Sequence, residues 1–242
     1  MYLKWEEKTI VDFSDKNIND LYDRGFVFTR TGKGDIYKTR SVRINLNKFE
    51  LSSENRRILR KTEELELDIK PIPYSEYSWR IGKLGKDFYE EKFGKGTFSA
   101  NKIKELLTDK EKSNFNFLLT YCHSEESKNL LKEGSFAPTQ DDSRVVQDDK
   151  CIGYCICHET NEIIHYSYPF YNLNTDNPNT GMGMMIRAVA WAKENNKKYI
   201  YLGSASSTKS LYKFQFKGIE WFNKEDGWTG DIKKIKVYLT DR

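Results

Sequence analysis

The sequence predicts an α+β fold, and three observations support this prediction. At 242 residues, 38% hydrophobic and 14% aromatic, the chain is long and apolar enough to bury real cores. Residues 151–159 and 162–171 form two apolar strand patterns around a short polar turn, which is typical of a hairpin. A mostly apolar helix over 181–196, a strand over 198–204, a helix and a final strand over 232–239 then complete a layered sheet.

We predict that the first half of the chain forms a smaller, basic α+β unit. We expect a helix over 14–25, a strand over 26–30, a turn, and an alternating strand over 37–46 that carries Arg43 on its outer face. A helix over 52–65 follows, with Ser52 or Ser53 as its N-cap and with Ile58, Thr62 and Leu65 facing inward. Two short helices over 86–94 and 99–109 complete this unit.

The second half begins with a strand over 115–121. The polar stretch 134–150, with its four aspartates, is expected to be a mobile loop because it has little to bury. These patterns divide the chain into residues 1–112 and residues 113–242, and the second unit holds the hairpin, the buried helix and the strands that follow it.

Positive charge is concentrated in residues 24–61. This segment holds eleven Lys and Arg against three Asp and Glu, a local charge of +8 in a chain whose total is +4. Arg56 with Arg60, and Arg57 with Lys61, lie one helical turn apart and form a cationic face. A polyanion partner and a solvated basic surface explain this charge equally well.

The composition also argues against several classes of protein. No apolar run approaches the roughly 20 residues needed to cross a bilayer, and the N-terminus lacks the apolar segment of a signal peptide, so we expect a cytoplasmic protein. The cysteines of "CIGYCICH" are typical of a close-packed, buried strand. A site built from Cys155, Cys157 and His158, with Cys122 and His123, matches no standard zinc spacing, so we predict no metal.

Three blocks of sequence, in one order, carry a resemblance to a known family. The last is "YIYLGSASSTKSLYKFQFKGIEWF", preceded by "YSYPFYN" and, further upstream, by "RSVRINLNKFELSSENRRILRK". These blocks resemble the aminoacyl-tRNA-protein transferases, the arginyl- and leucyl-transferases that tag protein N-termini for degradation, and they span roughly residues 20–222. The resemblance implies a GNAT-like mixed sheet and transfer of an amino acid from charged tRNA to an N-terminal α-amine.

The resemblance also implies roles for individual residues. The implied reaction needs no cofactor, since aminoacyl-tRNA is the co-substrate. The expected protein is a monomer that binds protein or peptide N-termini but no membrane. The expected catalytic residues are Lys213, Tyr201 and Ser204. Cations for tRNA phosphates would come from Arg43, Arg56, Arg57, Arg60, Lys61 and Lys209. The aminoacyl and acceptor pocket would be lined by Tyr168, Phe170, Tyr171, Gly203 and Tyr212.

The chain departs from the family pattern at several positions. Ile36 and Thr39 stand where many members carry paired cysteines, and the turn 204–210 lacks the family's usual aromatic and cysteine. These changes leave the donated amino acid and the acceptor open. Two residues also have a purely structural interpretation. Tyr212 would form a core pair with Phe216, and His165 would be a half-buried structural residue.

Two other functions compete with transfer from tRNA. "TGMGMM" resembles the phosphate loop of an acyl-CoA-dependent N-acetyltransferase of the same fold, although Pro178 stands where that family has Arg or Gln. The other is a tRNA-binding or N-terminus-reading module that lost the reaction, an alternative supported by the altered turn 204–210.

Overall fold

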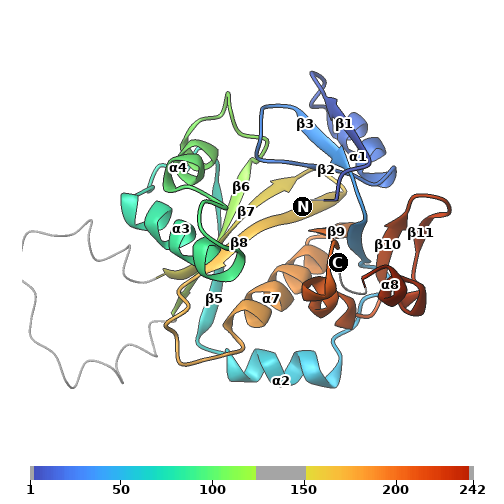
Figure 1. The fold of residues 1–242 in the computed structure, drawn as a ribbon. Helices are drawn as coiled ribbons and strands as arrows, with labels where there is room; N and C mark the ends of the chain where they lie inside the picture. The colour runs from blue at the N-terminus through green and yellow to red at the C-terminus, as the bar shows by residue number, and fades with distance from the viewer. Residues whose placement is uncertain (1–2, 124–150, 240–242) are drawn as a thin grey trace, which may run out of the picture.

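The computed structural model describes residues 3–123 and 151–239. It shows a mixed α+β fold in which one large sheet is flanked by helices, as predicted (Figure 1). The expected loop over 134–150 lies outside the described residues. Within the described ranges, no helix combines the length and the apolar composition that crossing a bilayer requires.

The large sheet has eight strands, and neighbours in the sheet are often far apart in the chain. All of its pairs are antiparallel except β8 with β9, which are parallel and connected by the crossover helix α7 (Thr180–Glu194). In spatial order the strands are β11 (Gly227–Thr229), β10 (Ile219–Asn223), β4 (Ser41–Asn45), β9 (Tyr199–Ser204), β8 (Ile163–Tyr171), β7 (Cys151–Glu159), β6 (Phe117–His123) and β5 (Leu65–Pro71).

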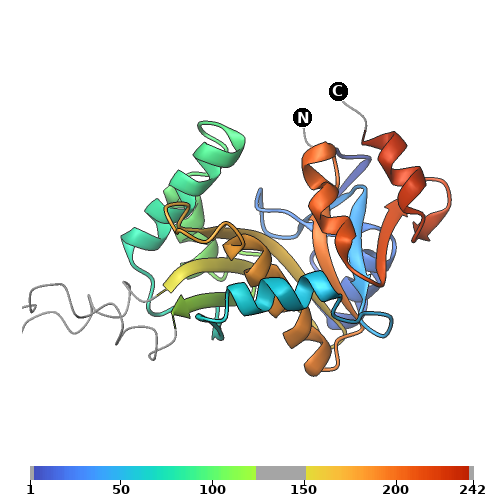
Figure 2. The ribbon, with the colours of Figure 1, turned by 90° about the horizontal axis from the view of Figure 1, so that it is seen from below.

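Two hydrophobic cores lie on opposite faces of this sheet. On one face α7, α2 (Ser53–Lys61) and α8 (Ile232–Tyr238) pack against the strands, and Figures 1 and 2 show α2 alongside α7. On the other lie α1 (Asp15–Asp23), α3 (Trp79–Phe93) and α4 (Ala100–Thr108). Along β7, Cys155 and Cys157 face the first core while Tyr154 and Ile156 face the second, so the predicted buried strand is confirmed, although Cys151 packs against the second core.

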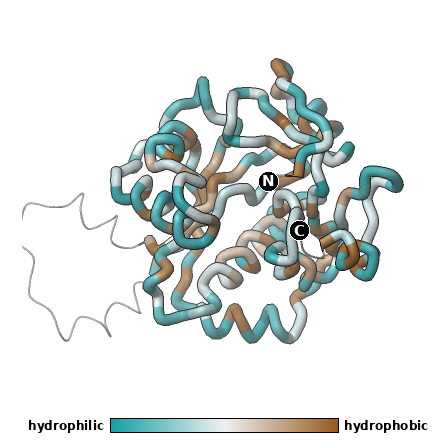
Figure 3. Tube along the Cα trace, viewed as in Figure 1, coloured by the Kyte–Doolittle hydropathy of each residue, from teal (hydrophilic) through white to brown (hydrophobic). Residues whose placement is uncertain are grey.

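Helix α2 begins where its sequence predicts, but it ends at Lys61, and Leu65, expected on its inward face, is the first residue of β5. Ser52 accepts the backbone N–H of Asn55, whose side chain accepts the N–H of Ser52 in return, a reciprocal cap that satisfies two donors at the helix start. Ile58 and Thr62 are buried, and Thr62 contacts Arg187 of α7. Most residues of α2 are hydrophilic (Figure 3).

A second, three-stranded sheet stands beside the first, in the order β1 (Glu6–Thr9), β3 (Asp35–Lys38), β2 (Phe26–Phe28). The predicted single strand over 37–46 is therefore wrong: β3 ends at Lys38 and β4 begins at Ser41 in the other sheet. A tight turn, in which Ser41 N–H donates to the carbonyl of Thr39 at 2.8 Å, separates the two strands.

The eight-stranded sheet does not follow the predicted division at residue 112. Strands β4 and β5 precede that residue, yet they pair with β9, β10 and β6, which follow it. The sheet therefore joins residues 1–112 to residues 113–242, and the existence of two independently folding units stays a prediction.

The predicted final strand over 232–239 is wrong, since these residues form α8. The Asp231 side chain accepts the backbone N–H groups of Lys233 and Lys234, which starts a helix, and Ile235 and Leu239 are buried one turn apart. The last strands of the sheet are instead β10 and β11.

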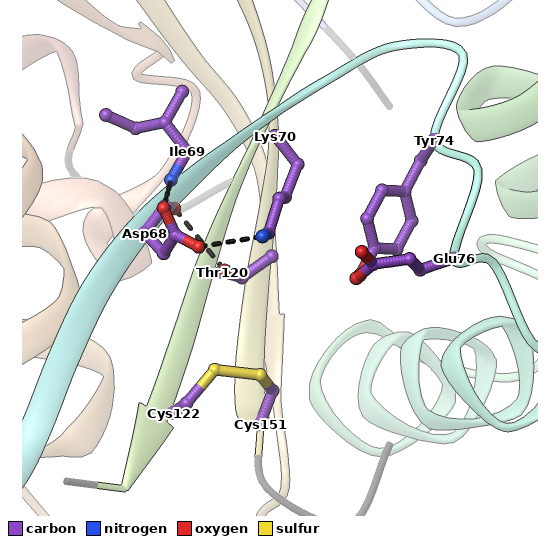
Figure 4. The surroundings of a disulfide bond; sticks show 8 residues. All are labelled: Asp68, Ile69, Lys70, Tyr74, Glu76, Thr120, Cys122 and Cys151. Carbon is purple, nitrogen blue, oxygen red and sulfur yellow. Dashed lines mark hydrogen bonds and ion pairs between the residues drawn. A yellow bond between two sulfur atoms is a disulfide. The ribbon is translucent and has the colours of Figure 1, made fainter. Parts of the chain in front are cut away.

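A disulfide bond between Cys122 and Cys151 links β6 to β7 (Figure 4). The cysteine spacing did not predict it, and it removes Cys122 from any metal site. Such bonds persist mainly in oxidising compartments, so a disulfide is not what the expected cytoplasmic location predicts. Cys155 and Cys157 remain free and buried, with their sulfur atoms 3.5 Å apart.

Candidate functional site

The candidate site lies where β8 and β9 stop pairing. Their parallel register covers only three residues of each strand and ends with His165 opposite Tyr201. Two residues later, at Ser167, β8 contains a bulge, because Ile156 pairs with Tyr168 and Cys157 pairs with Tyr166, which leaves Ser167 without an opposite residue. The strand ends beyond this point are therefore free of the β8–β9 ladder.

Gly203 is loosely surrounded at this point. Its φ is +74°, a conformation that favours glycine. Apart from the chain neighbours of Gly203, a Cβ atom built there would have two heavy atoms within 4 Å, Lys213 Nζ at 3.9 Å and His165 Nε2 at 4.0 Å, both at ordinary van der Waals distance. Two polar side-chain atoms from different elements thus converge on one position beside the chain.

Lys213 reaches this position from the segment after β9. That segment forms a 3-10 helix, η2 (Thr208–Gln215), where the sequence predicted an ordinary helix. Lys213 Nζ donates to the carbonyl oxygens of Leu202 at 2.7 Å and Ser204 at 2.8 Å. An ammonium has three protons, so one N–H remains beyond these two bonds. Burial lowers the pKa of Lys213 to about 8.

His165 is the site residue that sequence reasoning set aside. It is 1% exposed rather than half-buried, and its Nδ1 lies 2.9 Å from the hydroxyl of Tyr22. Burial, and secondarily the charges of His158 and Lys213, lower the pKa of His165 to about 3, so the ring is neutral near pH 7. The parallel pairing that brings it opposite Tyr201 could have revealed it, but a sequence alone does not give that register.

The other two expected catalytic residues sit differently. Ser204 is half-buried, and its hydroxyl lies 2.7 Å from that of Thr39. Tyr201 is buried, and its hydroxyl accepts a hydrogen bond from Arg43 at 3.2 Å. Burial raises the pKa of Tyr201, so this hydroxyl stays protonated and serves the Arg43 contact.

Arg43 does not lie on an outer face, so that expectation is wrong. Only 6% of its side chain is exposed; it contacts Asp23 at 2.6 Å and Glu220 at 2.9 Å. Its guanidinium also lies 3.8 Å from the ring centre of Tyr199 and 3.9 Å from that of Trp228. These partners already satisfy the cation, which makes Arg43 a structural centre rather than a surface charge.

The remaining expected tRNA contacts are at the surface. Arg56, Arg60, Lys61 and Lys209 are exposed, whereas Arg57 is half-buried and pairs with Glu54 through two hydrogen bonds. The first three form the exposed cationic face of α2, and Lys209 projects from η2.

The bulge at Ser167 separates the aromatic residues of β8. Tyr166 faces the α7 side, while Tyr168 and Phe170 face the α3 side, whereas regular strand alternation would place all three on one face. Phe170 is fully buried, which removes it from the expected pocket. Tyr212 is 46% exposed while Phe214 and Phe216 are buried, so Tyr212 and Phe216 do not form a core pair.

Two cavities lie near these residues. One of about 420 Å³ runs between α3 and the end of β8 and is lined by Trp79, Leu84, Phe88 and Tyr171 among others. The other, of about 300 Å³, is lined by Asp20, Asp23, Glu162, Tyr199 and Tyr201 among others. Lys213 and Gly203 line neither, so the candidate site rests on its converging polar atoms.

Packing explains the glycines of "TGMGMM". A Cβ atom on Gly181 would lie 2.7 Å from the hydroxyl of Tyr171, and one on Gly183 would lie 2.5 Å from the hydroxyl of Thr62. Close approach of α7 to these two side chains therefore requires glycine without any phosphate. Among the residues that the structure describes, no three His, Cys, Asp or Glu side chains are grouped as a metal site requires.

Comparisons with solved structures give distant similarities. FemX aligns with a TM-score of 0.48 at 11% identity, over 93% of this chain and 71% of its own. L-PGS from Bacillus licheniformis aligns with a TM-score of 0.45 at 12% identity, over 94% of this chain and 71% of its own. The C-terminal domain of a lysylphosphatidylglycerol synthetase from Agrobacterium fabrum aligns with a TM-score of 0.41 at 11% identity, over 79% of this chain. This chain spans about half (52%) of the length of that structure.

Comparison with curated protein sequences finds no match. A family model described as "Arginine-tRNA-protein transferase, C terminus" matches residues 95–223, just over half of the chain. The matched region contains β8, α7, β9 and η2, and with them Gly203, His165 and Lys213. The chain therefore belongs to the family of the arginine-tRNA-protein transferase C terminus, a family of aminoacyl-tRNA-dependent transferases.

Proposed function

We propose that the protein transfers an amino acid of the arginine or leucine class from charged tRNA to the N-terminal α-amine of an acceptor protein. The observation that carries this proposal is the convergence of Lys213 Nζ and His165 Nε2 on Gly203 within the region that matches the family. The donated residue and the protein acceptor are the parts that go beyond the family assignment.

The reaction makes a peptide bond from an ester that is already activated. The α-amine attacks the ester carbonyl carbon, a C–N bond forms, and the C–O bond to the terminal ribose breaks. The ribose oxygen leaves with a proton that the amine gives up. Because an α-amine has a pKa near ~8, a sizeable fraction is free base at neutral pH, and positioning can supply much of the rate acceleration.

Lys213 is suited to stabilise the charge that develops in this reaction. Its Nζ is held by two carbonyls of the β9 segment, so the ammonium is oriented before substrate arrives. A preorganised donor in a partly buried site stabilises an oxyanion more than a mobile one does. We assign Lys213 this role at the position beside Gly203.

The tRNA would meet surfaces around this site. Exposed Arg56, Arg60 and Lys61 on α2 offer cations for phosphates, and Lys209 offers one on η2. Tyr212, 46% exposed, and Tyr171, at the 420 Å³ cavity, offer rings on which bases of the single-stranded acceptor end can stack.

The experiment is transfer of radiolabelled amino acids from a total pool of charged tRNA to peptides beginning with Asp, Glu, Arg or Lys. We expect label on at least one peptide and none on the same peptide with an acetylated N-terminus. No label on any peptide, with charged tRNA bound, would overturn the proposal in favour of a binding module. If tRNA fails to bind and acetyl-CoA raises the melting temperature, the acyl-CoA alternative replaces it.

A further inference from the structure

His165 holds a fixed orientation in the candidate site. It is the last residue of β8 that pairs with β9, and the hydroxyl of Tyr22 holds its Nδ1 at 2.9 Å. The ring of Tyr22 also meets the imidazole edge-on, with centres 5.5 Å apart. The opposite nitrogen, Nε2, lies 4.0 Å from the position of a Cβ atom on Gly203. The side chain thus reaches from the core to Gly203.

Hydrogen bonding around Tyr22 is compatible with a ring proton on Nε2. The Tyr22 hydroxyl accepts the backbone N–H of Phe28 at 3.1 Å, and its own proton can be donated to His165 Nδ1. A neutral imidazole that accepts at Nδ1 carries its proton on Nε2. Because the pKa of His165 is lowered to about 3, chiefly by burial, the ring keeps this neutral form.

No hydrogen bond joins Nε2 to another described residue, and Nε2 is not one of their buried polar atoms that lack a partner. A substrate atom beside Gly203 would give Nε2 a partner.

We propose that His165 is a catalytic residue whose Nε2–H donates a hydrogen bond to the oxyanion formed when the α-amine attacks the aminoacyl ester. This inference rests on the proposed function. The carbonyl π electrons move to the oxygen as the C–N bond forms, and they return when the ribose oxygen leaves with the proton lost by the amine. His165 keeps its proton throughout, so it acts with Lys213 as an oxyanion donor and not as a general base.

Two substitutions separate this role from a structural one. In His165→Gln the amide nitrogen occupies roughly the place of Nε2, whereas in His165→Asn the side-chain oxygen can accept from Tyr22 but no donor reaches Gly203. With charged tRNA bound beforehand, we expect His165→Asn to lower the single-turnover transfer rate about 100- to 1000-fold. His165→Gln should stay within about tenfold of the wild type, and both variants should bind charged tRNA with unchanged Kd.

A structural histidine predicts the reverse order, because Asn preserves the Tyr22 bond and Gln loses it. Transfer by His165→Asn at the wild-type rate, or slower transfer by His165→Gln than by His165→Asn, would overturn the assignment. If His165→Asn does not fold, loss of transfer in folded His165→Gln by more than about 100-fold overturns it as well. If the wild-type protein shows no transfer, the proposed function itself is overturned. If both the wild type and His165→Asn transfer at the same rate, only the role of His165 is overturned.

Discussion

At the scale of single residues, the titration of Lys213 has a measurable effect on stability. Burial lowers its pKa to about 8 from the ordinary 10.5. Between these pH values the unfolded chain binds more protons than the folded protein, so this group makes the free energy of unfolding rise with pH across that window. Below pH 8 its charge is a constant penalty.

We expect Lys213→Met to remove this rise, which amounts to about 2 kcal/mol once solvent screening of the half-buried side chain is allowed for. The measurement is urea denaturation of both proteins at about pH 7.5 and about pH 10, where the other titrating groups are the same and their effects cancel in the difference. Identical pH dependence in wild type and variant would show that Lys213 has an ordinary pKa.

At the scale of elements, α2 is the predicted binding surface for tRNA phosphates. Arg57 is already paired with Glu54, so the arginines that remain exposed for phosphate are Arg56 and Arg60. Arg56→Ala with Arg60→Ala should weaken tRNA binding and reduce the slope of log K against log[salt] by about two, roughly one for each phosphate that the variant no longer neutralises. Filter binding between about 50 and 200 mM salt measures both.

The matched control is Lys92→Ala with Lys95→Ala, two exposed cations at the end of α3 and the loop after it. This variant should leave the slope within about half a unit of the wild-type value. A slope that falls equally in both variants would mean that general positive charge, and not α2, binds tRNA.

The elements also show what sequence reasoning can reach. Helix α2 could be predicted, because its cap and its inward stripe are local signals. The helix α8 could not, since "IKKIKVYL" fits a strand as well, and the choice depends on the Asp231 cap and on the burial of Ile235. The bulge at Ser167 leaves no mark in the sequence, so strand alternation alone would place Tyr166 and Tyr168 on the same face.

At the scale of the whole molecule, Arg43 ties distant segments together. Through its contacts with Asp23 and Glu220 it links α1, β4 and β10, and Trp228 of β11 stacks on it. Arg43→Met leaves the largely buried Glu220 without its main partner and should lower the free energy of unfolding by about 3–5 kcal/mol. Chemical denaturation measures this loss.

Lys48 gives a matched control, because it pairs with the same carboxylate from the surface. Lys48→Met should cost less than about 1 kcal/mol. Adding Glu220→Gln to Arg43→Met should recover part of the loss, since the unpaired charge is removed. A loss below about 1 kcal/mol in Arg43→Met would contradict a structural role.

The disulfide gives a second prediction at this scale. Cys122 and Cys151 are 29 residues apart, so their bond restricts a long loop in the unfolded chain and should stabilise the fold by about 3 kcal/mol. Dithiothreitol should lower the free energy of unfolding of the wild type by that amount. The variant with Cys122→Ser and Cys151→Ser should not respond, and a wild type equally indifferent to reductant would refute the stabilising bond.

The site was partly predictable for a related reason. Lys213, Gly203 and Ser204 lie within one stretch whose resemblance to the family marks it, and they do lie together. His165 joins them only through the parallel pairing of β8 with β9, and Arg43 leaves the surface only because Glu220, Tyr199 and Trp228 surround it. Contacts between segments far apart in the chain decide both placements.

The central claim is that the aminoacyl ester reacts beside Gly203, and Lys213 tests it most directly. The measurement is the single-turnover rate of transfer to a peptide from charged tRNA bound beforehand, in wild type, Lys213→Met and the control Lys217→Met, whose lysine is exposed and pairs with Glu50. We predict a loss of about 100-fold or more in Lys213→Met with unchanged tRNA Kd, and wild-type transfer in Lys217→Met. Wild-type transfer by Lys213→Met would contradict the claim and place the reaction elsewhere.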